Sequence, residues 1–585
     1  MILSLKICTI YYSHFLLHCA ILGKYVYRYF KERNTITMNS LKPFLLTSLK
    51  NYNRSQFFKD VTAGIIVAII ALPLSIALAL ASGVGPEAGI FTAIVAGFII
   101  SALGGSSVQI AGPTAAFATI VAGIVAKDGM DGLVIATILA GIFLIFMGLC
   151  HFGSLIRFIP CTITTGFTSG IAVTIVIGQL KDFFGLTYPE GLKPIETIEK
   201  MNAVIQNFST INVDAVIVGA VSLAILIIAP YIFKKIPGSL LAVIAGILMV
   251  QCLPLKVSTI GNLYTISNAL PSFHFPSVSF KAVQTALPNA FTIAVLAAIE
   301  SLLSCVVADG MINSKHRSDM ELVAQGAGNI ASALFGGIPA TGAIARTAAN
   351  IKNGGRTPIA GIVHSVTLLI VLVVLMPYAG MIPMPTIAAI LFNVAYNMCQ
   401  WRTFVKLLKT APKSDIIVLL TSFVLTVIFD LVVAIEIGMI LACLLFIKRM
   451  SEETHVDGWT YVDDDTPDVD EHLRQLPLQI RVYEISGPLF FGAANVIEHI
   501  VVKDLTTCLV LRMRSVTALD STAMNALIDL TEVCEARGIT VVFSHVNEQP
   551  MKVMDKAGFT KRVGKENFQP NIRAALKRAE EVIAK

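Results

Sequence analysis

The sequence predicts an all-α polytopic membrane domain followed by a small cytoplasmic α/β domain. The 585 residues are 55% hydrophobic and only 14% charged, whereas soluble domains carry about 25% charged residues. Long apolar runs recur between residues 57 and 450. After them, an acidic stretch precedes alternating strand and helix patterns.

Residues 1–56 are expected to form an amino-terminal lead-in on the cytoplasmic side. Residues 1–37 have an apolar middle broken by two histidines and lack a small-residue cleavage site, so they do not resemble a signal peptide. Met38 opens a more ordinary cytoplasmic sequence. We interpret residues 1–37 as the result of a start-codon error, and translation from Met1 is the alternative.

Residues 57–450 contain fourteen apolar segments and are assigned as the membrane domain. A helix that spans a bilayer needs about 20 residues. Ten segments are long: 61–81, 88–103, 131–149, 161–180, 212–233, 238–255, 287–308, 357–376, 414–431 and 432–448. Four are shorter or broken by glycine: 113–126, 320–335, 342–352 and 384–399.

The basic loops agree with this count. With fourteen segments, every loop in the following list lies on the same side as the amino terminus, which the positive-inside rule makes cytoplasmic. Both termini are therefore expected in the cytoplasm. The loops carry Arg157, Lys234, Lys235, Lys315, Arg317, Lys352, Arg356, Arg402, Lys406, Lys409 and Lys413.

Fourteen segments divide into two sets of seven. Because a repeat with an odd number of spans ends on the opposite side of the membrane, its second copy must be inverted relative to the first. SALGGSSVQIAGPTAAFATIVAG at 101–123 and SALFGGIPATGAIARTAANIKNG at 332–354 share their opening and a Gly/Pro/Ala/Thr passage. Matched, broken segments of this kind indicate a substrate site in the middle of an inverted-repeat transporter. Small-residue stretches that only pack helices together are the alternative.

Arg346 lies inside the second stretch, in GAIARTAAN. An arginine in a bilayer costs at least about 2.5 kcal/mol, so its presence calls for a function. If 114–126 and 343–352 are half-helices whose amino ends meet, their free N–H groups and dipoles create a site for negative charge. Arg346 adds a full charge that can bind an oxyanion through two donors. The alternative is an arginine that extends to the cytoplasmic interface.

Glu300 is a second charge within an apolar segment, AIESLLSCVVADG. Ser304 lies one helical turn further along the same face. Glu300 could carry a coupling proton or pair with Arg346. A structural carboxyl that is hydrogen-bonded within the bundle is the alternative.

Several function classes are disfavoured. The ten cysteines include no Cys-x-x-Cys pair, so a disulfide framework or zinc site is not supported. GFTKRVGKEN at 558–567 does not match a phosphate loop. The net charge of +6 is spread along the chain, which does not indicate nucleic-acid binding. We expect no cofactor and no resident metal, and an enzyme is the weakest option.

Three runs carry a resemblance to a known family: DVTAGIIVAIIALPLSIALALASGVGPEAGIFTAIVAGFI, GGSSVQIAGPTAAF and IARTAAN. The chain resembles the sulfate permease (SulP) family of anion transporters over residues 57–585. Three further stretches are most similar to a bacterial branch of the family that includes a proton-coupled carrier of succinate, fumarate and aspartate. They are AAIESLLSCVVADGMINSKHRSDMELVAQGAGNI, GAIARTAAN and APKSDIIVLL. The resemblance implies a core domain that moves against a gate domain, seven plus seven inverted helices, and a homodimer in the bacterial inner membrane.

By position, the resemblance implies an anion site and a coupling-ion site. The anion site would be lined by Thr114, Ala115, Phe117, Ala345 and Arg346, and the coupling ion would interact with Glu300 and Ser304. Two departures are visible. Pro73 is followed by Leu74 and Ser75 where many members have glutamine, and Glu300 stands where sodium-coupled bicarbonate carriers, which lack the arginine, have aspartate.

Residues 451–474 form an acidic linker, and residues 475–585 resemble a STAS domain. LQIRVYEI, TCLVLRM and ITVVFSHV read as short buried strands, and STAMNALIDLTEVCEARG reads as a helix. Asp520, Ser521 and Thr522 match a loop that is phosphorylated in anti-sigma-factor antagonists, although Ala523 replaces the usual glycine. An ordinary helix N-cap is the favoured alternative; a cytoplasmic regulator that binds this domain is a further possibility.

The leading hypothesis is a secondary transporter that moves a small anion by alternating access, with H⁺ as the coupling ion in preference to Na⁺. A sodium-coupled bicarbonate transporter, a passive anion channel and a nucleobase permease are the alternatives. Sulfate, a four-carbon dicarboxylate and bicarbonate all satisfy two helix ends and one arginine.

Overall fold

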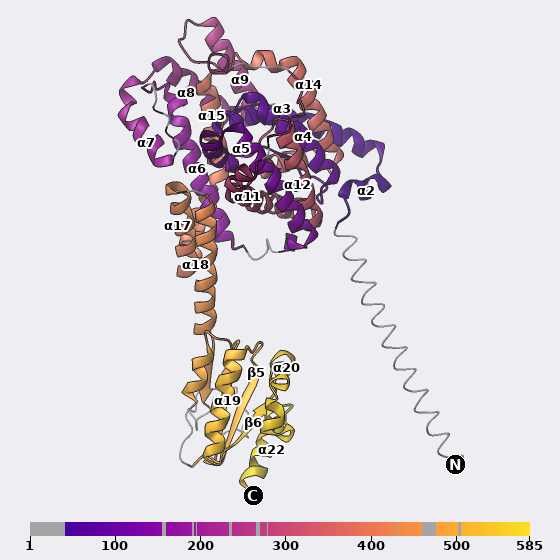
Figure 1. Ribbon diagram of the computed structural model, residues 1–585, viewed down its shortest axis with the longest axis vertical. Helices are drawn as coiled ribbons and strands as arrows, with labels where there is room; N and C mark the ends of the chain where they lie inside the picture. Colours follow the sequence, from indigo (N-terminus) through magenta and orange to yellow (C-terminus); the bar gives the residue numbers. More distant parts are fainter. Residues whose placement is uncertain are drawn as a thin grey trace, which may run out of the picture. The chain divides into compact units, whose positions relative to one another are not determined.

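The computed structural model describes residues 41–154, 159–189, 192, 194, 196–232, 237–264, 269–277, 279–429, 431–458, 476–500 and 505–584 (Figure 1). The chain divides into two compact units, Met1–Gly438 and Met439–Lys585. The interpretation of residues 1–37, and the choice between Met1 and Met38, lie outside the described residues.

A central group of helices in the first unit carries both of the matched stretches. Within it, α12 packs against α5 and α4, α14 against α3 and α4, and α11 against α5 and α13. Figure 1 shows α3, α4, α5, α11 and α12 close together. The members are α3 (Arg54–Ala81), α4 (Pro86–Leu103), α5 (Ala115–Leu149), α11 (Phe280–Ile312), α12 (Ser318–Leu334), α13 (Ile344–Lys352) and α14 (Ile359–Ala379).

A flanking group is built around α6, which packs against α15 and α17, while α8 packs against α9 and α15. Its members are α6 (Cys161–Phe184), α7 (Thr197–Gln206), α8 (Val213–Ile232), α9 (Gly238–Cys252), α15 (Met384–Cys399), α16 (Trp401–Thr410) and α17 (Lys413–Ile428). The helix α18 (Leu431–Glu452) follows α17, and the short helices are α2 (Phe44–Ser48), η1 (Leu49–Asn51), η3 (Phe208–Thr210) and α10 (Ile260–Leu263).

Each of the fourteen predicted apolar segments overlaps one of these helices. The segments 113–126 and 131–149 lie in α5, where Gly129 interrupts the helical backbone with φ 71° and ψ −172°, a conformation that side chains disfavour. Seven helices of the described residues are long and apolar enough to cross a membrane: Arg54–Ala81, Pro86–Leu103, Ala115–Leu149, Cys161–Phe184, Val213–Ile232, Phe280–Ile312 and Ile359–Met376. The count of fourteen spans stays a prediction.

The start of α3 is tied to the loop that follows α13 through a buried carboxylate. Asp60 accepts hydrogen bonds from the Arg356 backbone N–H (2.8 Å), the Thr357 hydroxyl (2.6 Å) and the Gln56 amide (2.9 Å). The Tyr52 hydroxyl also donates to Asp60 (3.0 Å). Burial and the Asp60 charge raise the pKa of Tyr52 to about 12, so the phenol keeps the proton that it donates.

The second unit contains a five-stranded sheet with helices on both faces, in the order β3-β4-β5-β6-β7. The first pair is antiparallel and the others are parallel. Alternate residues of a strand face opposite sides: Leu509 and Leu511 pack with α19, whereas Cys508 and Val510 pack with α22. The strands are β3 (His455–Gly458), β4 (Ile480–Ser486), β5 (Cys508–Ser515), β6 (Thr540–Ser544) and β7 (Phe568–Gln569), and the helices are η5 (Ala494–His499), α19 (Ser521–Ala536), α20 (Glu548–Lys556), α21 (Phe559–Val563), η6 (Lys565–Asn567) and α22 (Ile572–Ile583).

The predicted linker 451–474 is partly structured, and this corrects the sequence-based boundary. α18 continues to Glu452, and β3 pairs with β4 at the edge of the sheet. Residues 459–474 lie outside the described residues.

We expect Asp60→Ala to destabilise the first unit, because the Thr357 hydroxyl, which is buried, and the partly buried donors around Asp60 would lose their acceptor. Leaving a buried donor unpaired costs about 1 to 3 kcal/mol. The transition temperature of the detergent-solubilised protein should therefore fall clearly below that of wild type. Asp131→Ala, at an exposed carboxylate, is the matched control. Equal transition temperatures for the two variants would contradict the assigned role of Asp60.

Candidate functional site

The two matched stretches meet as a short β-ribbon. β1 (Ala111–Gly112) pairs antiparallel with β2 (Thr341–Gly342), with Ala111 opposite Gly342 and Gly112 opposite Thr341. α5 begins three residues after β1, and α13 begins two residues after β2. The ribbon therefore places the first turns of two half-helices near each other, as the sequence predicted, and the first turn of a helix has N–H groups without intrahelical partners.

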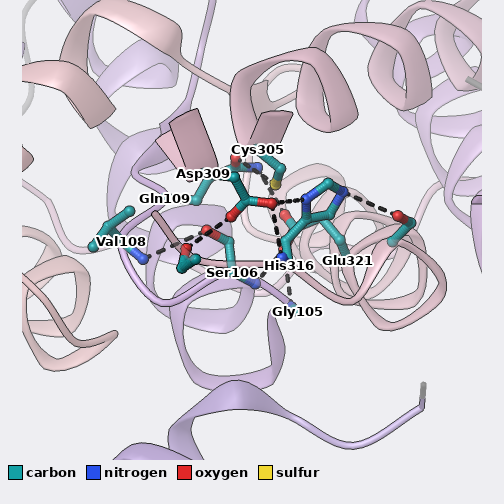
Figure 2. Close-up of polar contacts among 10 residues, drawn as sticks. Gly105, Ser106, Val108, Gln109, Cys305, Asp309, His316 and Glu321 are labelled. Atoms are coloured by element: carbon teal, nitrogen blue, oxygen red, sulfur yellow. Dashed lines mark hydrogen bonds and ion pairs between the residues drawn. The ribbon is translucent and has the colours of Figure 1, made fainter. Parts of the chain in front are cut away.

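A buried polar stripe on α12 holds the segments that enter the ribbon. Glu321 accepts hydrogen bonds from the backbone N–H of Gly105 (2.9 Å) and Ser106 (3.2 Å), and from the amides of Gln109 (2.7 Å) and Gln325 (3.0 Å). Figure 2 shows Gly105, Ser106, Gln109 and Glu321 gathered together with Cys305, whose thiol donates to Gln109 (2.9 Å). The stripe thereby fixes the approach to β1.

The same stripe fixes the approach to β2. Asn329, two turns after Glu321, accepts from the Ala340 N–H (2.8 Å) and donates to the Ala340 carbonyl (2.9 Å). From α11, the Ser301 hydroxyl accepts from the Gly342 N–H (3.1 Å) and lies 2.6 Å from the Thr341 hydroxyl. Both strands are therefore positioned by side chains of α11 and α12.

Arg346 is the third residue of α13, and its side chain is only 1% exposed. Its Nη2 donates to the Ser75 hydroxyl (3.3 Å) and to the Pro113 carbonyl (3.2 Å). Nε and Nη1 have no hydrogen-bond partner among the described residues. The guanidinium thus bridges α3 and the turn before α5, and part of its donor capacity is unused.

Two glycines allow the side chains at the ribbon to approach the backbone. A Cβ at Gly112 would collide with Nη1 of Arg346, and a Cβ at Gly342 would collide with the Gln109 amide. Gly112 makes room for the guanidinium. Gly342 is packed against the side chain of Gln109.

Glu300 contacts the start of α5. Its Oε2 accepts from the Thr114 hydroxyl (2.9 Å), and Thr114 is the N-cap of α5. The alternative that Glu300 pairs with Arg346 is wrong in the part of the chain that the structure describes, because Arg346 bonds to Ser75 and Pro113 and its other donors have no partner. The Ser304 hydroxyl, one turn further along α11, lies 3.5 Å from the Thr347 hydroxyl of α13.

The other predicted lining residues lie in the same two first turns. Ala115 and Phe117 are buried near the start of α5, whereas Ala345 is exposed on α13 next to Arg346. Glu300 and Thr114 are partly accessible. All seven predicted residues lie at the N-cap or in the first turn of α5, in the first turn of α13, or on α11.

Some polar residues of this region were not predicted. Glu321, Gln325 and Asn329 recur every four residues, so helical periodicity could have revealed a buried polar face. His364, in the apolar run of α14, is 1% exposed, and neither of its ring nitrogens has a partner among the described residues. An isolated histidine in a long apolar run was the available signal.

The loop before α19 has the geometry of an ordinary helix cap. Asp520 is the N-cap, and its carboxylate accepts from the backbone N–H of Ala523 (2.9 Å) and Phe491 (2.8 Å). This confirms the N-cap interpretation. Ser521 and Thr522 are exposed in the first turn, and their regulatory role stays a prediction.

Comparison with known proteins defines the class to which this arrangement belongs. The chain is a multi-pass membrane anion transporter with a carboxy-terminal STAS domain, and as predicted it is not an enzyme. It belongs to the sulfate permease family, whose model matches residues 57–422, while the STAS domain model matches residues 474–575.

Two bacterial relatives and one animal structure illustrate the similarity. YvdB of Bacillus subtilis (strain 168), named as a candidate sulfate transporter, is 40% identical over 89% of this chain and 97% of its own length. The bicarbonate transporter BicA of Picosynechococcus is 31% identical over 89% and 94%, respectively. The inward-facing murine anion transporter Slc26a9 shares the fold with a TM-score of 0.82, at 18% identity over 93% of this chain and 94% of that one.

We expect Gly112→Ala to weaken the interaction with the transported anion while the protein still folds. The new Cβ would displace the end of a flexible arginine side chain, not backbone. Losing one charge-assisted hydrogen bond costs about 1.5 to 3 kcal/mol, so the KM for uptake should rise at least about tenfold. Gly123→Ala is the matched control, because a Cβ there meets nothing within 4 Å. A KM equal to that of the control would contradict the close approach at Gly112.

Proposed function

We propose that the protein is a proton-coupled secondary transporter that takes up a small dianion, sulfate or a four-carbon dicarboxylate, by alternating access. The observation that carries this proposal is Arg346, which is buried and has no partner for Nε or Nη1 among the described residues. A buried charge normally requires a compensating partner. An anion bound at the ribbon would supply the missing charge and the missing acceptors.

The surroundings of Arg346 favour an oxyanion with several acceptor atoms. The first turns of α5 and α13 contribute N–H groups and the positive ends of two helix dipoles. The guanidinium adds donors arranged in a plane, which suits carboxylate and sulfate oxygens. Thr114, Ala115, Phe117 and Ala345 would border the anion, because they lie in the same two turns.

Glu300 is the proposed carrier of the coupling proton. Its carboxylate accepts from Thr114 at the start of α5, so a change in its protonation would alter the N-cap next to the anion. Ser304 and Thr347 extend the polar contact from α11 to α13.

Bicarbonate is the second candidate substrate, because a relative with 31% identity is named as a bicarbonate transporter. Sulfate is favoured by the name of the relative with 40% identity. Labelled sulfate, succinate and bicarbonate should be compared in proteoliposomes with and without an inward proton gradient. Accumulation against a concentration gradient would separate a transporter from a passive channel.

The proposed setting is the inner membrane of a bacterium, with both termini in the cytoplasm and a homodimer as the assembled form. The relative from Bacillus subtilis supports a bacterial setting, and the basic loops support the orientation. Regulation through Ser521, Thr522 or a cytoplasmic partner of the STAS domain remains part of this proposal.

Arg346→Lys should weaken anion binding, because lysine keeps the charge but lacks the planar pair of donors. The loss of a charge-assisted hydrogen bond predicts an affinity lower by about ten- to a hundredfold. Arg54→Lys, at an exposed arginine, is the control. Superimposable binding isotherms for wild type and Arg346→Lys would show that the arginine does not bind the anion.

Glu300→Gln should abolish the dependence of uptake on an inward proton gradient, because the amide keeps the shape of the side chain but does not titrate. Exchange of labelled for unlabelled anion should persist, since it needs no net proton movement. The initial rate of uptake is measured with the gradient imposed and again after a protonophore. Undiminished stimulation by the gradient in the variant would rule out Glu300 as the proton carrier.

A further inference from the structure

The short helix α16 (Trp401–Thr410), in the flanking group, contains no buried residue. At about 100° per residue, its sequence WRTFVKLLKT divides into two faces. One face is apolar and the other is polar with three basic residues. The apolar residues are Trp401, Phe404, Val405, Leu407 and Leu408; the basic residues are Arg402, Lys406 and Lys409.

The chain turns sharply at both ends of α16. Gln400 has φ 44° and ψ 42°, a left-handed conformation that ends α15, and its carbonyl accepts from the Thr403 N–H (2.8 Å). At the other end, Pro412 precedes α17, and a proline disfavours helical backbone at the residue before it. α16 is therefore a separate helix and not an extension of either neighbour.

The apolar face of α16 has a protein side and an open side. The Phe404 ring packs on Phe423 of α17, with 5.4 Å between ring centroids, and Leu407 and Leu408 are partly buried. Trp401 is 46% exposed and Val405 is 37% exposed. Apolar surface that is left open on a membrane domain is suited to contact with lipid, and tryptophan favours the membrane interface.

The basic residues adjoin this open side. None of Arg402, Lys406 and Lys409 forms an ion pair with an acidic residue in the part of the chain that the structure describes. The Arg402 guanidinium lies over the Trp401 ring, 5.6 Å from its centroid. The helix therefore presents uncompensated positive charge directly beside exposed apolar side chains.

We propose that α16 lies in the membrane interface and binds anionic phospholipid headgroups through Arg402, Lys406 and Lys409. Charge complementarity selects the occupant: an amphipathic helix with basic residues beside its apolar face binds anionic lipid surfaces. The positive-inside orientation places these residues at the cytoplasmic leaflet. The surface is distinct from the anion site and belongs to the flanking group of helices.

Trp401 supplies a reporter for this surface. The chain has two tryptophans, Trp401 and Trp459, so Trp459→Phe leaves Trp401 as the sole fluorophore. The full-length variant is placed in nanodiscs of phosphatidylcholine that contain a minor fraction of either brominated phosphatidylglycerol or brominated phosphatidylcholine. Bromine quenches tryptophan on contact, so the ratio of the two quenching efficiencies measures the lipid preference beside α16.

The expected result is stronger quenching by brominated phosphatidylglycerol, with a preference of about fivefold for each basic side chain that engages a headgroup. Lys406→Gln with Lys409→Gln should reduce the preference at least fivefold. The control variant Lys561→Gln with Lys577→Gln, at exposed lysines of the second unit, removes the same net charge and should leave the lipid preference unchanged.

Three outcomes would overturn the proposal. These are equal quenching by the two lipids, equal effects of the two double variants, and loss of the preference when inorganic phosphate replaces chloride at constant ionic strength. The last result would mark a site for soluble phosphate and not for lipid. None of these readouts depends on transport, so the proposal can fail or stand independently of the proposed function.

Discussion

The antiparallel pairing of Ala111–Gly112 with Thr341–Gly342 is the contact on which the membrane unit depends. Irregular backbone is tolerated at membrane depth only where it is enclosed by protein or lines a cavity. Here the backbone groups of the two strands pair with each other. The buried polar side chains of α11 and α12 form hydrogen bonds with the backbone in and around the strands. Two helices can therefore begin in the middle of the domain instead of crossing it without a break.

This arrangement also explains why a buried arginine is tolerated. Arg346 meets a serine hydroxyl and a backbone carbonyl, which are polar but uncharged. The positive ends of the α5 and α13 dipoles also lie beside it. The rest of the fold offsets the free-energy cost of burying this charge, and a bound anion would lower that cost. A site of this kind would bind an anion because the anion neutralises the buried positive charge.

Much of the helical framework follows from the sequence, because long apolar runs require helices and the breaks at glycine mark where helices stop. The two half-helices and the place of Arg346 were predicted from the likeness of 101–123 to 332–354. The supports of the site were not. Glu321 and Gly105 are 216 residues apart, and neither residue alone indicates the other. β3 was missed within the acidic linker, because an exposed edge strand such as HVDG needs no apolar alternation.

The proposed lipid-binding helix α16 lies among the flanking helices, whereas the proposed anion site lies among the central ones. The two groups would thus differ in what they bind, since the central group would bind a small anion and the flanking group would contact the membrane surface. Such a division would let the bilayer hold the flanking helices in place while the central helices carry the anion.

The most direct test is the structure of the full-length protein in nanodiscs, determined by electron cryo-microscopy with its transported anion. The account predicts density for the anion within hydrogen-bond distance of Arg346 Nε or Nη1 and of backbone N–H groups in the first turns of α5 and α13. An anion bound elsewhere, or an Arg346 guanidinium paired with a carboxylate of the protein, would contradict it.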